Sequence, residues 1–216
     1  MACTDTAALN SYTQAMRAWL SFPSPWLLAL FALISAIART QLAPIVWRDG
    51  VLFLAGIALW PWIEWTLHRY VLHMKPIRWG SRTWDLAWSQ KHRAHHRSPT
   101  DPRLILLPPV LHLVAGSLLF VLAFVSPQPA LALSMVCGVA LAALNYEWTH
   151  FLVHTRVRPR LHYYQSLFRA HRLHHFRNEN YWYGFTLTSV DRCLGTGPHA
   201  DAVERSEHCH DLGISS

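Results

Sequence analysis

The stretch LILLPPVLHLVAGSLLFVLAFVSPQPALALSMVCGVALAALNY, residues 104–146, decides the fold because it contains no aspartate, glutamate, lysine or arginine. About 20 predominantly apolar residues suffice for an α-helix to cross the hydrocarbon core of a bilayer, so this run is long enough for two crossings. The sequence SPQP at residues 126–129 breaks the run near its middle, since proline interrupts a helix. The stretch therefore predicts a tight hairpin of two transmembrane helices.

Two other apolar segments bring the number of predicted spans to four. Residues 18–38 carry no ionisable side chain, and residues 51–68 read VLFLAGIALWPWIEWTLH. In the second segment Pro61 is expected to kink the helix, and Glu64 lies too deep in the span to face lipid. The small residues at 36–38 leave open a cleaved signal peptide in place of the first span.

The chain has 216 residues, which is enough for one domain, and only 14% of them are charged. We therefore expect an all-α integral membrane protein, a four-helix transmembrane bundle with a histidine-rich cytoplasmic cap of shorter helices. The membrane domain should occupy residues 18–196. A cytoplasmic segment at residues 1–17 would precede it, and a polar C-terminal tail at residues 197–216 would follow it.

Positive charge is distributed unevenly around these spans. Of the 19 lysines and arginines, eight lie between His68 and Arg103 and eight lie between His154 and the C-terminus. By the positive-inside rule both segments and the N-terminus are cytoplasmic, and the tip of the hairpin lies on the other side of the membrane. The net charge of +7 then reflects topology and attraction to anionic lipid rather than nucleic-acid binding. The four cysteines show no CxxC pairing, which leaves any metal chemistry to histidine.

Ten of the fifteen histidines form four clusters, and the clusters repeat as two pairs. EWTLHRYVLH at residues 64–73 is echoed by EWTHFLVH at residues 147–154, and an HxxHH sequence follows each of them after 17 to 19 residues. We interpret the repeat as two half-sites, each made of a helix end and a cytoplasmic segment. The ten residues are His68, His73, His92, His95, His96, His150, His154, His171, His174 and His175.

The spacings of these histidines have a geometric meaning on a helix. Residues three or four apart lie on one face, so HxxHH presents three rings to one side, and His150 and His154 stack one turn apart, as chelation of a single ion requires. His68 and His73 lie about 140° apart around an ideal helix and cannot chelate one ion from it. We expect His73 to lie at or beyond the helix end, or to reach a second ion.

Ten imidazoles are too many for one metal ion and suit two ions with several nitrogen ligands each. A ligand must be a neutral ring, and the neighbouring Lys91, Arg93 and Arg97 should disfavour protonation of the rings. Carboxylates are expected behind the ligands, where they offset positive charge, and the candidates are Glu64, Glu147 and Asp191. His162, nine residues before His171, is a further candidate for a residue that supports the ligands.

The remaining histidines are assigned no ligand role. His112 lies in an apolar span and should be a hydrogen-bonded core residue. The polar tail contains His199, His208 and His210, and its HCH sequence is interpreted as a disordered coincidence. Tryptophans near the span ends are interpreted as an interfacial belt: Trp60, Trp62, Trp65 and Trp148.

A histidine-rich site for two metals at a membrane surface suits the oxidation of a lipid chain. Iron is the expected metal, because imidazole binds it and it can activate O₂, the co-substrate, to attack an unactivated C–H bond. Zinc fits the same ligands but not that chemistry. A haem carrier or a metal transporter would need ligands deeper in the bilayer, where the hairpin offers only His112. A metal-binding membrane protein without turnover is the alternative outside enzymes.

The order HxxxxH, HxxHH, HxxxH, HxxHH resembles that of the fatty acid hydroxylase and sterol desaturase superfamily over about residues 64–196. Four flanking sequences are similar to those of fatty acid 2-hydroxylases: HMKP at 73–76, HHRSPTDPRLILLPP at 95–109, YEWTH at 146–150 and GFTLTSVDRCLGT at 184–196. The resemblance implies a di-iron monooxygenase, with all ten clustered histidines as metal ligands. Its lipid substrate would be a long acyl chain, free or in a ceramide-like lipid, hydroxylated beside the carbonyl. A carotenoid or sterol hydroxylase or desaturase with the same boxes is the alternative.

Two features differ from the usual pattern of that family. Family members often carry an N-terminal cytochrome b5 domain, whereas only a short segment precedes the first predicted span here. Electrons are therefore expected from a separate donor, a cytochrome b5-like protein or a ferredoxin with its reductase. The third histidine box has Glu147 in place of the usual aspartate and Thr155 in place of a common histidine.

The basic cap, including Arg93, Arg97 and Arg172, would face a polar headgroup and the reductase.

Overall fold

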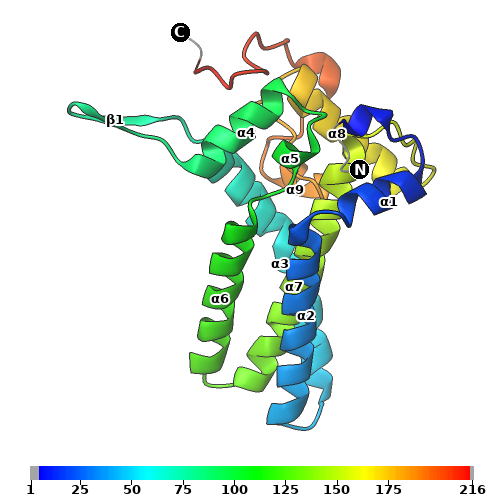
Figure 1. The fold of residues 1–216 in the computed structure, drawn as a ribbon, viewed down its shortest axis with the longest axis vertical. Coiled ribbons are helices and arrows are strands. Elements are labelled where there is room, and N and C mark those ends of the chain that lie inside the picture. The colour runs from blue at the N-terminus through cyan, green and yellow to red at the C-terminus, as the bar shows by residue number, and fades with distance from the viewer. Residues whose placement is uncertain (1–4, 215–216) are drawn as a thin grey trace. The chain divides into compact units, whose positions relative to one another are not determined.

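The computed structural model describes residues 5–214 and is predominantly helical, which confirms the all-α prediction (Figure 1). The helices are η1 Thr6–Ala8, α1 Tyr12–Trp19, α2 Pro23–Leu42, α3 Trp47–Thr66, η2 Leu67–Leu72, α4 Ala87–Arg97, α5 Pro102–Ile105, α6 Pro109–Val125, α7 Pro129–Val153, α8 His162–Phe176, α9 Thr188–Cys193 and η3 Ala200–Ala202. Two short antiparallel strands, β1 Ile77–Trp79 and β2 Arg82–Trp84, form a hairpin that the sequence did not predict.

The chain divides into two compact units, which are described separately. Unit 1 comprises Met1–Met16, Pro61–Leu106 and Thr149–Ser216. Unit 2 comprises Arg17–Trp60 and Leu107–Trp148. All ten clustered histidines therefore belong to unit 1.

Within the described residues, four helical segments are long and apolar enough to cross a membrane: Pro23–Leu42, Trp47–Leu72, Pro102–Val125 and Pro129–Val153. The predicted hairpin is confirmed, because one segment ends at Val125 and the next begins at Pro129. The first span begins at Pro23 rather than at residue 18, since the preceding residues form the separate helix α1 and proline favours the first position of a helix. The second span starts earlier than predicted, at Trp47, and ends later, at Leu72.

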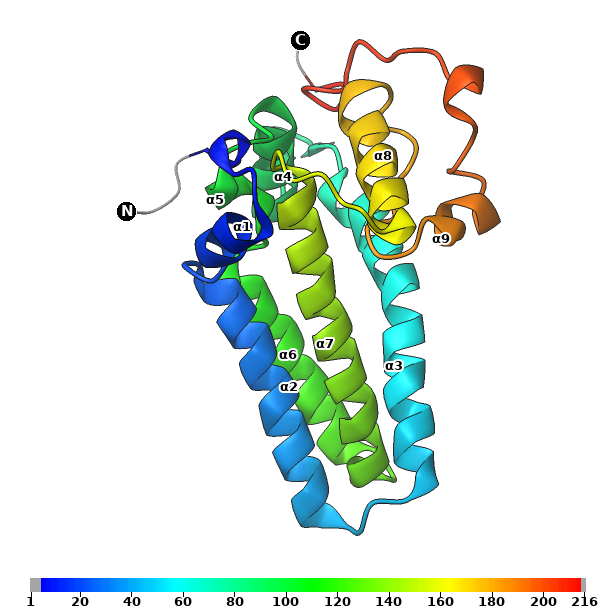
Figure 2. The ribbon, with the colours of Figure 1, turned by 90° about the vertical axis from the view of Figure 1, so that its right-hand side faces the viewer.

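Helix α7 is central to unit 2, where it lies between α3 on one side and α2 with α6 on the other (Figure 2). Half of its apolar window is buried, compared with 17–28% for the other three spans. Glu147 on α7 accepts hydrogen bonds from the hydroxyl of Ser24 on α2 at 2.7 Å and from Nε2 of His112 on α6 at 2.8 Å. The prediction that His112 is a hydrogen-bonded core residue is confirmed.

The outer face of unit 2 is apolar. Trp26, Leu54 and Val121, from three different spans, each expose more than half of their surface, between 58% and 63%. Large exposed side chains of this kind are costly in water and favourable in hydrocarbon. The exposure therefore supports the membrane assignment that length and composition indicate.

A buried ion pair fixes the turn between α2 and α3. Arg39 near the end of α2 pairs with Asp49 in the first turn of α3 and also donates to the Ala43 carbonyl at 2.6 Å. Asp49 accepts further hydrogen bonds from the Val46 backbone N–H at 2.8 Å and from the Ser134 hydroxyl at 2.6 Å. Each buried charge therefore has several partners, as burial of a charge requires.

Both ends of the described chain belong to unit 1 and contact its core. The hydroxyl of Thr6 in η1 donates to the His154 carbonyl at 2.7 Å. In the tail, Val203, Cys209 and Leu212 are buried, with 6%, 4% and 5% of their surface exposed. The expectation that the HCH segment around Cys209 is a disordered coincidence is therefore wrong, because these apolar side chains anchor the tail.

Two glycines allow α3 and α7 to approach each other closely. A Cβ atom at Gly56 would lie 2.3 Å from the backbone oxygen of Met135, and one at Gly138 would lie 2.1 Å from the backbone oxygen of Phe53. Both distances are far below a van der Waals contact, and backbone atoms cannot rotate away as a flexible side chain can. Small residues at these positions therefore set the distance between the two helices.

We predict that Gly138→Ala lowers the free energy of unfolding by about 1–3 kcal/mol, because the added methyl group overpacks against the Phe53 carbonyl. Gly50→Ala is the matched control, since a Cβ atom there meets nothing within 4 Å and alanine favours a helix over glycine. Thermal unfolding of the detergent-solubilised variants, followed by circular dichroism, measures both. Equal stability of the two variants would contradict the close approach of α3 and α7.

Candidate metal centre

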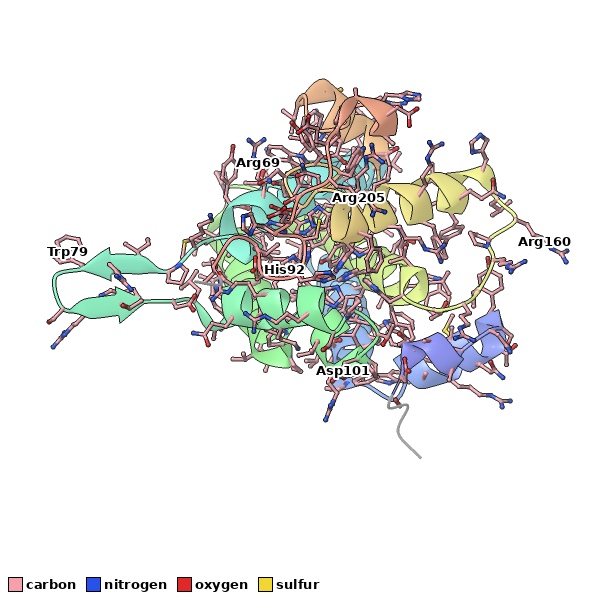
Figure 3. All side chains as sticks on the ribbon, turned by 90° about the horizontal axis from the view of Figure 1, so that it is seen from above. Arg69, Trp79, His92, Asp101, Arg160 and Arg205 are labelled. Atoms are coloured by element: carbon pink, nitrogen blue, oxygen red, sulfur yellow. The ribbon has the colours of Figure 1, made fainter. Side chains whose placement is uncertain are left out.

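The ten clustered histidines come together in unit 1 as two groups of five. Each residue offers one ring nitrogen, and within a group these nitrogens all lie within 4.8 Å of one another. Group 1 comprises His68, His73, His92, His96 and His174, and group 2 comprises His95, His150, His154, His171 and His175. The groups are adjacent, because the rings of His96 and His175 stack with their centroids 4.1 Å apart. Figure 3 marks His92 of group 1 on α4.

Each HxxHH helix divides its three rings between the two groups. Helix α4 places its first and last rings in group 1 and its middle ring, His95, in group 2. Helix α8 does the reverse, since its middle ring, His174, joins group 1. Consecutive residues differ by about 100° around a helix, so the second and third rings of HxxHH diverge. The predicted half-sites are therefore wrong in one respect: neither half is complete without a ring from the other.

A π-helical turn brings His68 and His73 into one group. The chain is π-helical over η2, and the backbone N–H of His73 donates to the His68 carbonyl at 3.1 Å. Hydrogen bonds that join residues five apart return such residues to the same face. The two ring centroids are accordingly only 4.9 Å apart. His73 lies just beyond the end of η2, as one of the two expectations stated, and its ring joins the same group as that of His68.

Backbone carbonyls orient three rings of group 1. The Nδ1 atoms of these rings donate to carbonyls at 2.7–2.8 Å: His68 to Tyr183, His96 to Cys209 and His174 to Tyr181. A ring that carries its proton on Nδ1 presents an unprotonated Nε2 on its other side, which is the tautomer that a metal ligand needs. Three lone pairs therefore point into group 1 before any ion is bound.

The ring nitrogens converge at separations that suit a shared ion. Nε2 of His92 lies 3.1 Å from Nε2 of His68 and 3.2 Å from Nε2 of His96. In group 2, the Nε2 atoms of His154 and His171 are 2.8 Å apart. Nitrogens bound about 2.1 Å from one ion lie about 3 Å apart when their bonds meet at right angles.

Several buried ring nitrogens have no hydrogen-bond partner among residues 5–214. They are Nε2 of His73 and His174, Nδ1 of His171, and both nitrogens of His95 and His175. Buried polar atoms are almost always paired in proteins, and each exception calls for an explanation. A cation bound by a group would take up one nitrogen of each of its rings, so the residues of both groups fit metal ions.

Burial keeps the rings neutral. Burial lowers the pKa of His174 to about 4. Burial, followed by the neighbouring imidazoles, also lowers the pKa of His92 and of His95 well below the ordinary value for histidine. A neutral ring is the form that binds a metal, so ligand competence does not depend on a high pH.

The basic residues beside His92, His95 and His96 are not the main reason why the rings are neutral. Arg93 is buried and pairs with Asp85, and the ammonium group of Lys91 donates to the Leu106 carbonyl at 2.7 Å. Arg97 is exposed at the last position of α4. The expectation that these three charges hold the rings unprotonated is therefore corrected, since burial dominates.

Asp191 organises the loop that supplies the Tyr183 carbonyl. Its buried carboxylate accepts four hydrogen bonds at 2.7–3.1 Å, from the backbone N–H groups of Tyr183 and Gly184, the Thr196 hydroxyl and the Trp65 indole. Burial raises the pKa of this carboxyl, while the four donors favour its charged form. Asp191 is thus linked to His68 through the backbone of Tyr183.

Glu64 holds the same loop at its next two residues. Its Oε1 accepts hydrogen bonds from the backbone N–H of Phe185 at 2.9 Å and of Thr186 at 2.7 Å, and the side chain is buried, as its depth in the span predicted. The ring of Phe185 contacts both groups, with centroids 4.8 Å from His68 and 4.5 Å from His150. Phe185 therefore covers the rings with an apolar surface.

Two of the four candidates for supporting residues lie elsewhere. Glu147 bonds to Ser24 on α2 and to His112 on α6, and all three residues belong to unit 2. His162 is the first residue of α8, where its ring is exposed, and it belongs to neither group. Both predictions rested on nearness in sequence, which does not fix the direction of a side chain.

Sequence reasoning missed the main-chain acceptors at Tyr181, Tyr183 and Cys209. Every residue has a carbonyl, so no residue type marks one that orients a ligand. It also assigned Trp65 to an interfacial belt, whereas this side chain is 5% exposed and its indole donates to Asp191. The similarity of GFTLTSVDRCLGT to a known segment was the one signal that pointed to this loop.

The fold and the site together define a helical membrane protein in which ten of the fifteen histidines form two adjacent groups suited to metal ions. The family model described as fatty acid hydroxylase matches residues 53–196. The chain therefore belongs to the fatty acid hydroxylase family, whose named members are oxidoreductase enzymes.

Named relatives and a solved structure agree with this family. The chain is 27% identical over 188 residues to a dihydroceramide fatty acyl 2-hydroxylase of Arabidopsis thaliana, covering 87% of this chain and 76% of the relative. It is 32% identical over 146 residues to a fatty acid 2-hydroxylase of Macaca fascicularis, covering 67% of this chain but only 39% of that relative. The structure of full-length scs7p, in which only the hydroxylase domain is visible, has a TM-score of 0.66 at 20% identity and covers 91% of this chain and 70% of that one. The structural likeness confirms the fold.

We predict that Asp191→Asn loosens the loop at residues 183–186, because an amide presents one N–H₂ group where the carboxylate accepts hydrogen bonds from four donors. The expected loss of stability is about 1.5–3 kcal/mol. Hydrogen exchange of the Tyr183 and Gly184 amides, followed by mass spectrometry, should become faster. Asp201→Asn is the matched control, since its carboxylate is 90% exposed. Unchanged exchange in Asp191→Asn would show that the carboxylate does not hold the loop.

Proposed function

We propose that this chain is a membrane-bound lipid hydroxylase that uses two iron ions and O₂ to place a hydroxyl group at position 2 of a long acyl chain, free or within a ceramide-like lipid. The observation that carries the proposal is the pair of five-imidazole groups, whose rings are buried and neutral. The names of the plant and primate relatives support the substrate class and the position of the hydroxyl group.

All ten clustered histidines are proposed as metal ligands, with group 1 holding one ion and group 2 the other. Iron, when bound, supplies the O₂ chemistry that oxidises an unactivated C–H bond. Zinc would fit the same nitrogens without that chemistry. The unpaired ring nitrogens support the assignment of two ions. So do the separations of about 3 Å between Nε2 atoms of other rings within each group.

The protein's own contribution is to prepare and shield the site. Backbone carbonyls hold the rings of His68, His96 and His174 in the ligand tautomer, so less order has to be gained when an ion binds. Glu64 and Asp191 fix the loop that carries Phe185, and the ring of Phe185 excludes water from the rings that it covers.

The reaction also needs electrons. Insertion of one oxygen atom converts R–H, O₂, two electrons and two protons into R–OH and water. We propose that the electrons come from a separate one-electron carrier, cytochrome b5-like or a ferredoxin with its reductase. The uneven distribution of lysine and arginine supports a multi-pass membrane protein whose histidine-rich side faces the cytoplasm.

Metal content tests the ligand assignment. Protein reconstituted with iron should contain about two ions per chain by inductively coupled plasma mass spectrometry. His95→Ala and His174→Ala should each lose most of one ion, because loss of a ligand or its support weakens metal binding at least about 10–100-fold. His162→Ala is the control, since its ring lies outside both groups and should leave two ions. Retention of both ions by the two ligand variants would rule the assignment out.

Lipid analysis under ¹⁸O₂ tests the reaction. Expression of the protein in a host that makes long acyl chains should yield chains with one ¹⁸O-labelled hydroxyl at position 2, as read from fragment masses. His95→Ala should abolish the label because it removes a ring of group 2. A label at another carbon would reassign the product, and a label that survives His95→Ala would show that the histidine site is not responsible.

A further inference from the structure

Unit 1 carries a groove lined by six arginines, hereafter the arginine groove. Its volume is about 710 Å³, and the segment after α7 and helix α8 form most of its walls. The arginines are Arg156, Arg158, Arg169, Arg172, Arg177 and Arg205. Figure 3 shows Arg205 beside α8. Five of the six are exposed, and within residues 5–214 no carboxylate forms an ion pair with any of them.

A smaller cavity lies beside the arginine groove and is lined in part by histidines. Its volume is about 170 Å³, and three rings of group 2 line it: His154, His171 and His175. Four residues line both this cavity and the groove: Thr155, Arg156, Arg172 and Phe176. A partner seated in the groove would therefore lie against the residues that surround group 2.

We propose that the arginine groove docks the electron carrier, a small one-electron redox protein with an acidic face. This inference rests on the proposed function, which consumes two electrons per turnover. Each turnover would oxidise two reduced carrier molecules by one electron each, which balances the reaction stated above. Guanidinium groups without carboxylate partners attract carboxylates and bind them in a bidentate manner, so the groove fits an acidic protein surface.

The composition of the groove favours a protein over a lipid headgroup. Its cations are all arginine, and Phe168, Leu173 and Phe176 add apolar surface between them. Arginine and aromatic side chains are enriched at protein interfaces, where they often carry much of the binding energy. Segments that attract anionic lipid use lysine and arginine alike. A single phosphate group would also fill only a small part of this groove.

A second opening, near group 1, has different chemistry. A cavity of about 230 Å³ includes His73 together with Arg69, Lys75 and Asn180. It also includes Glu179, so its positive charge is partly compensated within the cavity. This opening suits an acidic protein face less well than the arginine groove does.

Matched charge reversals test the docking site. The groove variant combines Arg158→Glu, Arg169→Glu and Arg205→Glu, which line the groove but not the smaller cavity. The control variant combines Arg17→Glu, Arg78→Glu and Arg82→Glu, which are exposed and line neither. Both variants have the same net charge, so any difference between them depends on position.

Two carriers serve as probes, the soluble haem domain of cytochrome b5 and a [2Fe–2S] ferredoxin. At low salt, the groove variant in nanodiscs of neutral lipid should bind the carrier at least about tenfold more weakly than the control, and added salt should weaken binding to the unaltered protein. Carrier-driven hydroxylation should show a raised KM for the carrier with a kcat near that of the unaltered protein. Hydroxylation driven by dithionite should be the same in all three proteins.

Equal carrier binding by the two variants, or binding of neither carrier by the unaltered protein, would overturn the proposal. So would unchanged carrier binding with a loss of turnover confined to nanodiscs that contain phosphatidylserine, which would assign the groove to lipid headgroups. Absence of dithionite-driven hydroxylation from all three proteins would count against the proposed function instead. In that case the binding comparison would still decide whether the groove is the docking site.

Discussion

The burial of ten neutral imidazole rings in one unit is the constraint on which the rest of this structure depends. Each ring has two nitrogens, and a buried nitrogen without a partner costs about 1–3 kcal/mol. Protonation offers no relief, because burial and the neighbouring rings lower the pKa of His92 and His95. The surrounding protein must therefore supply a hydrogen-bond acceptor, or leave room for a cation, at each nitrogen.

The backbone meets this demand at three of the ten rings. The carbonyls of Tyr181, Tyr183 and Cys209 accept hydrogen bonds from three rings. These carbonyls all follow His175, the last of the ten histidines, in the sequence. A change of helix type at η2 turns His73 toward His68. The loop after α8 and the C-terminal tail are thus parts of the site, although neither contributes a ring to it.

The spans and the ten histidines could be predicted because they depend on residue type, as the hairpin turn at residues 126–129 shows. The division into two groups could not, because it depends on how α4 and α8 pack together. An ideal helix was the wrong reference for His73, since a π-helical turn is a property of the backbone. Glu147 lies three residues before His150 but faces Ser24 and His112, so nearness in sequence failed as a guide.

The two groups depend on each other because His95 of α4 belongs to group 2 and His174 of α8 belongs to group 1. Group 1 is complete only when α8 delivers His174, and group 2 is complete only when α4 delivers His95. Displacement of either helix therefore removes ring nitrogens from both groups at once. If each helix served its own group, one group could form without the other. Because each helix supplies rings to both groups, the two groups can be complete only together. The rings of His96 and His175 stack where the two helices meet.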